Sequence, residues 1–156
     1  MIKLTRIDDR LVHGQVAFTW TPALGVDCLL IANDKVAKDE FMKMTLSLAK
    51  PAGTKLLIKA VKEAAAFLND EKSKNARVLV LINNVKDAAA LAAEVAEIKT
   101  INFGGLRSKE GSKLISKAVA VNDDDVVIIR DMLAKGIELE VRQVPTDNKQ
   151  LIESLI

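Results

Sequence analysis

The sequence predicts an α/β fold: a single open, twisted, mostly parallel β-sheet with helices on both faces and an antiparallel edge strand near the C-terminus. Short apolar runs alternate with longer amphipathic ones along the chain, which is the pattern of a parallel sheet covered by helices. The runs Cys28–Ala32 and Val78–Ile82 are almost continuously apolar, as in strands buried on both faces. A length of 156 residues, without a long linker, fits one domain.

The strands expected in this sheet are spread along the whole chain. The first is Ile2–Ile7, and it runs into the charged stretch Asp8–His13. Apolar and charged side chains alternate along Ile137–Arg142, and because one wet face is typical of an edge strand, we expect the edge strand here. The other expected strands are Cys28–Ala32, Lys55–Lys59, Val78–Ile82, Thr100–Phe103 and a short one near Ala118–Val121.

The segments between the strands carry apolar residues at helical spacing. The first is Gln15–Leu24, where Pro22 should kink or restart the helix. A helix over Asp123–Lys135 is expected from its asparagine or aspartate cap, its acidic first turn and Gly136 as its stop. A short last helix is expected at Asn148–Ile156. The other apolar stripes are Ala37, Phe41, Met44 and Leu48; Val61, Ala64, Ala65 and Leu68; and Ala88, Leu91, Ala92 and Val95.

The composition argues against several classes of function. With 49% hydrophobic and 28% charged residues the chain has material for a core and does not resemble a disordered protein. Its 23 basic and 21 acidic residues give a net charge of +2, which is too even to favour nucleic acid or an anionic membrane. An aromatic content of 3% also leaves few side chains on which bases could stack.

The sequence also bears on the compartment. Cys28 is the only cysteine and opens an apolar run, so we expect a buried thiol in a reducing environment. The start of the chain shows no apolar core of a signal peptide, and no run approaches the ~20 apolar residues that span a bilayer. We therefore expect a soluble, cytoplasmic protein.

Ligands of open α/β sheets bind beyond the carboxyl ends of the strands. The residues that follow the expected strands at this edge are Asp8–Gly14, Asn33–Asp34, Lys59, Asn83–Asn84 and Gly104–Arg107. They supply an imidazole, guanidinium groups, amides and glycine backbone. Such a set suits an oxyanion better than an apolar ligand.

His13 is the only histidine and stands where a charged loop meets the start of a helix. A neutral imidazole is a nucleophile that needs little activation at neutral pH. Arg10 can bind phosphoryl oxygens in a fork, and the backbone N–H groups from Gly14 onward can bind the remaining oxygens. We therefore hypothesise that His13 carries a phosphoryl group.

Structural roles compete for the same residues. A lone histidine at such a junction is more often structural than catalytic, and either aspartate of the Asp8-Asp9 pair can fix the His13 ring or hold Arg10. A metal site is not indicated, because one histidine and one distant cysteine leave only carboxylates at no recognisable ligand spacing. Two other pairs also have structural interpretations, Gly104-Gly105 as a strand-ending turn and Asn83-Asn84 as a helix cap.

The stretch R-I-D-D-R-L-V-H-G-Q-V, Arg6–Val16, closely resembles the phosphorylation-site motif of a known family. The family is the IIB component of the mannose/fructose/sorbose class of the bacterial sugar phosphotransferase system, which includes N-acetylgalactosamine systems. The resemblance implies one domain over residues 1–156 with an open, mostly parallel sheet. Supporting matches elsewhere in the chain are Gly25–Asp27, Ala32–Asp34, Ala49–Gly53 and Asn102–Gly105.

The resemblance also implies roles for individual residues. His13 falls on the family's phosphorylated histidine, which takes the phosphoryl group on Nδ1, and Arg10 falls on its phosphate-stabilising arginine. No cofactor and no metal are implied. The residues expected to surround the phosphoryl group are Arg6, Asp9, Gly14, Gln15, Asn83, Gly104 and Gly105.

The partners implied by the resemblance are other components of the same system. The IIA component would donate the phosphoryl group from a phosphohistidine. The acceptor would be a sugar held by the membrane components IIC and IID, so the domain would associate peripherally with the membrane transporter. No nucleic-acid partner is expected, homodimerisation is compatible with the sequence, and the sugar is left open.

A signalling receiver domain is the alternative from another class, since Asp8 or Asp9 at the end of the first strand could be its phosphorylated residue. Such a domain needs an aspartate at the end of the third strand and a divalent metal. Lys59 stands at that strand end in this chain. The hypothesis that His13 carries a phosphoryl group is therefore favoured.

Overall fold

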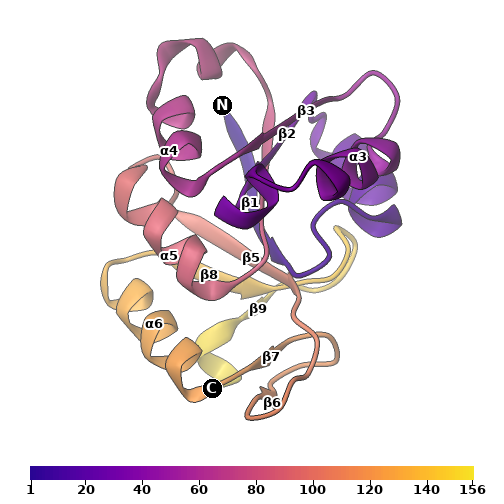
Figure 1. The fold of residues 1–156 in the computed structure, drawn as a ribbon. Helices are drawn as coiled ribbons and strands as arrows, with labels where there is room; N and C mark the ends of the chain where they lie inside the picture. Colours follow the sequence, from indigo (N-terminus) through magenta and orange to yellow (C-terminus); the bar gives the residue numbers. More distant parts are fainter.

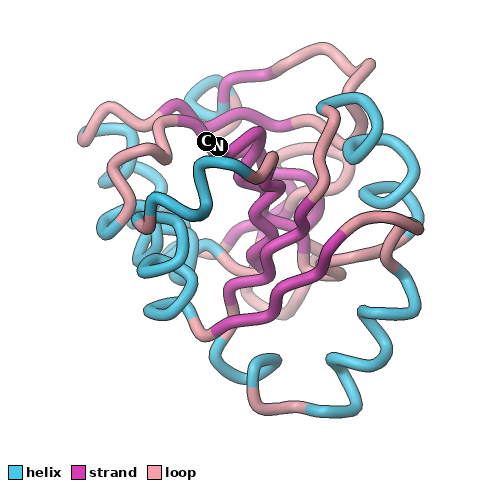
Figure 2. Tube along the Cα trace, turned by 90° about the horizontal axis from the view of Figure 1, so that it is seen from above, coloured by secondary structure: helices cyan, strands magenta, loops and turns pink.

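The computed structural model describes residues 1–156 as one open β-sheet with helices on both sides (Figure 1). Seven strands form the sheet in the order β3-β2-β4-β1-β5-β8-β9, and every neighbouring pair is parallel except β8 with β9. Figure 2 shows the strands lying between two groups of helices. The predicted class, an open and mostly parallel sheet covered on both faces, is confirmed.

The strands of the main sheet are β1 (Ile2–Asp8), β2 (Cys28–Ala32), β3 (Lys55–Lys59), β4 (Val78–Ile82), β5 (Thr100–Gly105), β8 (Glu138–Val141) and β9 (Gln150–Leu151). A separate antiparallel pair is formed by β6 (Lys113–Leu114) and β7 (Ala120–Val121). The helical elements are η1 (Val16–Trp20), α1 (Thr21–Leu24), α2 (Asp34–Ala37), α3 (Glu40–Ala49), α4 (Val61–Asn69), η2 (Glu71–Asn75), α5 (Val85–Glu94), α6 (Asp123–Ala134) and η3 (Ile152–Ser154). None of these helices is both long enough and apolar enough to cross a membrane.

Two apolar clusters hold the helices against the sheet, one on each face. Neighbouring residues of one strand belong to different clusters: Leu79 to the cluster that includes residues of η1, α2 and α3, and Val80 to the cluster that includes residues of α4, α5 and α6. Both side chains are fully buried. This two-sided burial explains why the runs that became β2 and β4 are apolar at every position.

Two helical segments begin and end as their sequences predicted. The first helical segment winds as a π-helix over Val16–Trp20 and restarts as an α-helix at Thr21, with Pro22 in the first turn. Asn122 caps α6 in a reciprocal pair with Asp125, in which each side chain accepts the other residue's backbone N–H. Gly136 follows α6 in the left-handed conformation that glycine adopts readily.

The C-terminal elements correct two predictions. The sheet does end in an antiparallel strand near the C-terminus, but this strand is β9 and not Ile137–Arg142. The strand within Ile137–Arg142 is β8, which pairs parallel to β5, and its Glu140 is 3% exposed because Asn102 and Arg142 bind the carboxylate. The helix predicted over Asn148–Ile156 is replaced by β9 and the short η3, since pairing with β8 outweighs local helical preference.

Two further predictions hold only in part. The stripe Ala37, Phe41, Met44 and Leu48 does not form one core-facing row, because Asp39 starts a new helix by accepting the N–H of Met42. Phe41 and Leu48 are 74% and 84% exposed, and the buried residue of α3 is Leu46. The short strand expected near Ala118–Val121 exists as β7, but it pairs with β6 outside the main sheet.

Candidate functional site

The site lies where the carboxyl ends of β1, β4 and β5 meet. β1 and β4 are neighbours, yet the element after β1 packs on one face of the sheet and the element after β4 packs on the other. Diverging connections of this kind open a crevice between the two strand ends. The loop that follows β1 therefore lies beside the ends of the neighbouring strands, with Arg10 and Gly14 exposed to solvent.

The loop from Asp8 to His13 begins with a tight turn held by Asp8. The carbonyl of Asp8 accepts the N–H of Leu11 at 3.0 Å, and Oδ1 of Asp8 accepts the N–H of Arg10 at 3.0 Å. Leu11 adopts a φ of 57°, in the left-handed region that costs a residue with a side chain about 1–2 kcal/mol. Because Leu11 and Val12 are each only 4% exposed, burial of their side chains offsets that cost and fixes the loop.

His13 folds back over the end of β1 and contacts Asp8. Nε2 of His13 lies 2.7 Å from Oδ2 of Asp8, and the two side chains are 14% and 1% exposed. Burial alone would raise the pKa of Asp8, but the hydrogen bond from His13 and the charge of Arg6 outweigh it and hold that pKa below its usual value. Asp8 is thus a carboxylate that only accepts, so Nε2 of His13 is the donor in this contact.

Arg6 lies directly beneath this pair. Nη2 of Arg6 donates to Oδ2 of Asp8 at 3.0 Å, and Nη1 donates to Oδ1 of Asn102 at 2.8 Å. The side chain is fully buried, and burial lowers the pKa of its guanidinium while the charge of Asp8 opposes that shift. The donors of Arg6 are directed at Asp8, Asn102 and the carbonyl of Arg142, so the structure places its guanidinium beneath Asp8, and its expected contact with the phosphoryl group stays a prediction.

A chain of polar contacts continues from Arg6 into the sheet. Asn102 donates to Glu140, and Glu140 is paired with Arg142 at 3.0 Å. The guanidinium carbons of Arg6 and Arg142 lie 5.5 Å and 5.1 Å from the ring centroid of Trp20, a distance at which cations are attracted to an aromatic face. These contacts give Arg6 a fixed position from which to hold Asp8.

Gly104 is needed for packing in this network. A Cβ placed on Gly104 would come within 1.9 Å of Cζ of Arg6, so the guanidinium occupies the space of the missing side chain. At Gly105 the nearest atom to an added Cβ is Oδ1 of Asp8 at 3.6 Å, which is an ordinary contact. The two glycines predicted to bind phosphate therefore differ. A side chain at Gly104 would overlap the Arg6 guanidinium, whereas a Cβ at Gly105 would fit without overlap.

A cavity of about 340 Å³ opens beside the loop. Arg10, Gly104 and Gly105 line it together with Asp9. Asp9, predicted to lie near the phosphate, binds Arg107, whose backbone N–H and Nε both donate to its Oδ2 at 2.9 and 3.0 Å. Arg10 itself is exposed and its guanidinium forms no ion pair, so its charge is available to a ligand.

Asn83 belongs to a second cavity, of about 640 Å³, on the other side of the Asp9–Arg107 pair. Its Oδ1 accepts Nδ2 of Asn33 at 3.0 Å and Nδ2 of Asn84 at 2.7 Å. Asn84 in turn caps α5, as the sequence allowed. The structure thus places Asn83 near the site but not in the cavity that contains Arg10.

Gly14 and Gln15 begin the helical segment directly after His13. The carbonyl of His13 accepts the N–H of Ala17 at 2.8 Å, and Gln15 has helical φ and ψ of −63° and −46°. The first N–H groups of a helix have no acceptor within it, so those of Gly14 and Gln15 are available beside the ring. A Cβ on Gly14 would meet only Phe18, at 3.9 Å, and packing therefore does not explain this glycine.

Several residues of the site were not identified from the sequence. Lys117 and Gln143 line the cavity with Arg10, but they lie far along the chain in segments that were expected to be short strands or their ends. Glu140 was placed on a wet face. The alternation along β8 showed that Glu140 lies on the face opposite Leu139, but it did not show that this face is buried. A buried charge needs partners, and sequence spacing alone does not identify them.

Comparison with known proteins decides the family. Residues 2–156 match the model of the phosphotransferase system sorbose subfamily IIB component. The chain belongs to this family. It is therefore a IIB component of the sorbose/mannose class, and it functions in sugar phosphotransfer.

The individual relatives agree with the family model. The sorbose-specific EIIB component of Lacticaseibacillus casei is 37% identical over 147 residues, covering 94% of this chain and 90% of that protein. The crystal structure of the IIBSor domain of the sorbose permease from Klebsiella pneumoniae superposes with a TM-score of 0.93 at 31% identity, covering 99% of this chain and 94% of that one. The mannose-specific EIIAB component of Escherichia coli is 36% identical, and the chain spans 48% of its length.

The signalling alternative finds no support. The relatives are sugar phosphotransferase components, and Asp8 is buried between His13 and Arg6. Asp9 is bound to Arg107. Neither aspartate is placed as an open phosphate acceptor.

Proposed function

We propose that His13 carries the phosphoryl group of this IIB component and that the group is bonded to Nδ1. The observation that supports this most directly is the hydrogen bond from Nε2 to Asp8, which leaves Nδ1 as the free nucleophile. Arg10 belongs to the same loop and has an unpaired charge. The activity is that of a protein-phosphohistidine–sugar phosphotransferase.

Two transfers make up the proposed cycle. In the first, the Nδ1 lone pair attacks the phosphorus of a phosphohistidine on the donor, and the donor's N–P bond breaks as the new one forms. The ring of His13 becomes cationic, and Asp8 stabilises that charge through Nε2–H. Arg10 and the free N–H groups after His13 bind the phosphoryl oxygens.

In the second transfer a sugar hydroxyl attacks the phosphorus of phosphorylated His13. The N–P bond to Nδ1 breaks, the bond to the sugar oxygen forms, and the hydroxyl proton passes to the vacated Nδ1 and then to water. Both steps rely on positioning and charge stabilisation within the protein. Binding must stay weak enough for the sugar to remove the group.

We assign the donor role to a IIA component and the acceptor role to a sugar held by IIC and IID in the membrane, with this chain associating peripherally. Support for the IIA partner comes from the relative in Escherichia coli, which is an EIIAB component. The names of the relatives differ in sugar, sorbose in one and mannose in another, so the sugar of this chain stays open.

Labelling by a phosphorylated IIA protein tests the proposal. Wild-type protein should take up the phosphoryl group in a form that survives alkali and is lost in acid, whereas His13→Gln should take up none. The variant should unfold at nearly the wild-type temperature, because the side chain of His13 is linked to the fold through one hydrogen bond. Labelling of the variant, or an alkali-labile product, would remove His13 from the mechanism.

A further inference from the structure

The segment from Leu106 to Ala118, here called the basic flap, carries much of the positive charge near the site. It contains four cationic side chains and one acidic side chain in a protein whose net charge is +2. The four cationic side chains are Arg107, Lys109, Lys113 and Lys117, and all are exposed. The flap follows β5 directly and includes β6, so it borders the carboxyl end of the sheet (Figure 1).

The cationic side chains of the basic flap do not share one environment. Arg107 is bound to Asp9, and Lys109 lines the cavity that contains Asn83. Lys113 lies in β6 and lines neither cavity. Lys117 is the lysine of the flap that lines the same cavity as Arg10.

The backbone around Lys117 is fixed. The carbonyl of Ala118 accepts the N–H of Leu106 at 2.9 Å, and the carbonyl of Leu106 accepts the N–H of Ala120 at 2.8 Å. Leu106 and Val119 are 7% and 0% exposed, and they belong to the main core. The stem of Lys117 therefore starts from a rigid position at the edge of the cavity.

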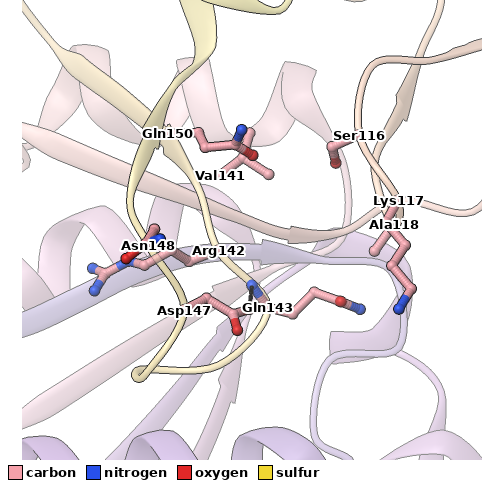
Figure 3. Close-up of a pocket in the computed structure, with 9 residues that line it drawn as sticks. All are labelled: Ser116, Lys117, Ala118, Val141, Arg142, Gln143, Asp147, Asn148 and Gln150. Atoms are coloured by element: carbon pink, nitrogen blue, oxygen red, sulfur yellow. Dashed lines mark hydrogen bonds between the residues drawn. The ribbon is translucent and has the colours of Figure 1, made fainter.

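The ammonium group of Lys117 has no ion pair. The only carboxylate in the cavity, that of Asp9, is already bound to Arg107. Lys117 also lines the adjoining cavity of about 420 Å³ on the side of Arg142, and Figure 3 shows its side chain extending toward that of Gln143. The cavity shared by Arg10 and Lys117 thus has surplus positive charge and a floor of glycine backbone, which suits a multiply charged oxyanion.

We propose that Lys117 is a second phosphoryl-binding cation, which contacts the transferring group together with Arg10. This rests on the proposed function of His13. In the transition state, negative charge spreads over the phosphoryl oxygens. Two cations that line one cavity can neutralise that charge together, and Arg10 alone would neutralise less of it. The basic flap would then complete the site only through this one lysine.

Single-turnover transfer from a phosphorylated IIA protein tests the proposal with three variants. Lys117→Gln should lower the maximal rate by about 100-fold, the lower end of the range seen when one charge-stabilising donor is removed. Lys117→Arg should stay within a few-fold of wild type, because it restores the charge. Lys113→Gln is the matched control, since it removes the same charge from the same flap outside the cavity, and its maximal rate should equal that of wild type.

The phosphorylated proteins offer a second readout by ³¹P NMR. A nearby cation favours the dianion and lowers the last pKa of the phosphoryl group. That pKa should therefore rise in Lys117→Gln and stay at the wild-type value in Lys113→Gln. A purely structural role of Lys117 would not produce this pattern.

Two outcomes would overturn the proposal. An unchanged maximal rate and phosphoryl pKa in Lys117→Gln would exclude contact with the group. Equal increases in the half-saturating donor concentration for Lys117→Gln and Lys113→Gln, at an unchanged maximal rate, would assign the flap to protein docking instead. His13→Gln distinguishes these failures from a wrong carrier, because labelling of that variant would refute the proposed function itself.

Discussion

Nε2 of His13 and Oδ2 of Asp8 are 2.7 Å apart, and the same Asp8 oxygen is bound from below by the buried Arg6. This relationship fixes the ring, its protonated nitrogen and the charge beneath it. In the proposed mechanism, the bond from Nε2 to Asp8 orients the ring so that Nδ1 is the nitrogen that attacks phosphorus. It also makes Asp8 the residue through which the fold controls the site.

Replacing Asp8 by asparagine should slow phosphoryl transfer strongly. An amide cannot stabilise a cationic ring as a carboxylate does. Because an amide has both donors and an acceptor, it can pair with Nε2 whether or not Nε2 is protonated, so the proton is no longer held on Nε2 and away from Nδ1. We expect a fall of about 100-fold or more in the single-turnover rate. A variant that transfers within a few-fold of wild type would show that the carboxylate is not used.

The pKa of Asp8 predicts a dependence of stability on acid. Because its folded-state pKa lies below the ordinary value of 3.8, the unfolded chain binds the proton first as the pH falls. The stabilisation is complete above that ordinary value and is lost as the pH falls through the lower folded-state pKa. Urea unfolding of wild type and Asp8→Asn should show a difference in unfolding free energy that narrows from about pH 5 to about pH 2. A difference that is constant over this range would contradict the pairing.

Gly104→Ala and Gly105→Ala form a matched pair. The first places a methyl group in the space of the Arg6 guanidinium, whereas the second makes an ordinary contact with Asp8. Because Arg6 would lose its buried partners, we expect Gly104→Ala to cost about 3 kcal/mol or more in unfolding free energy. Gly105→Ala should change it by less than about 1 kcal/mol. Equal effects in urea unfolding would show that Arg6 has room to move.

Arg10→Ala should separate transfer from stability. The side chain is exposed and forms no ion pair, so its loss should change the unfolding free energy by no more than about 0.5 kcal/mol. The transfer rate should fall by about 100-fold, as when a preorganised charge is removed from a transition state. Transfer kinetics equal to those of wild type would remove Arg10 from the mechanism.

The layers of the fold could be predicted from the sequence because the burial pattern of each strand and helix is contained in its own segment. Continuous apolar runs and helical stripes report burial on two faces or on one, and this identified β2, β4, α4 and α5. The failures occurred where distant residues decide the structure. Glu140 is buried because Asn102 and Arg142 bind it, and the segment that follows Asn148 pairs with β8 instead of forming a helix.

The site shows the same division. The motif around His13 was readable because its residues are adjacent in the chain, whereas the choice between Asp8 and Asp9 was not. In the structure, Asp8 is hydrogen-bonded to the His13 ring and Asp9 to Arg107. Arg6 was expected to face the phosphate. Its burial beneath Asp8 follows from the central position of β1 between β4 and β5, which the sequence did not reveal.

The most direct test of the account is the identity of the phosphorylated ring nitrogen. The chain contains one histidine, so the long-range ¹H–¹⁵N NMR spectrum of the phosphorylated protein should show a single imidazole pattern. We predict phosphorus bonded to Nδ1, with the proton retained on Nε2 next to Asp8. A phosphoryl group on Nε2, or an imidazole unchanged by phosphorylation, would contradict the account.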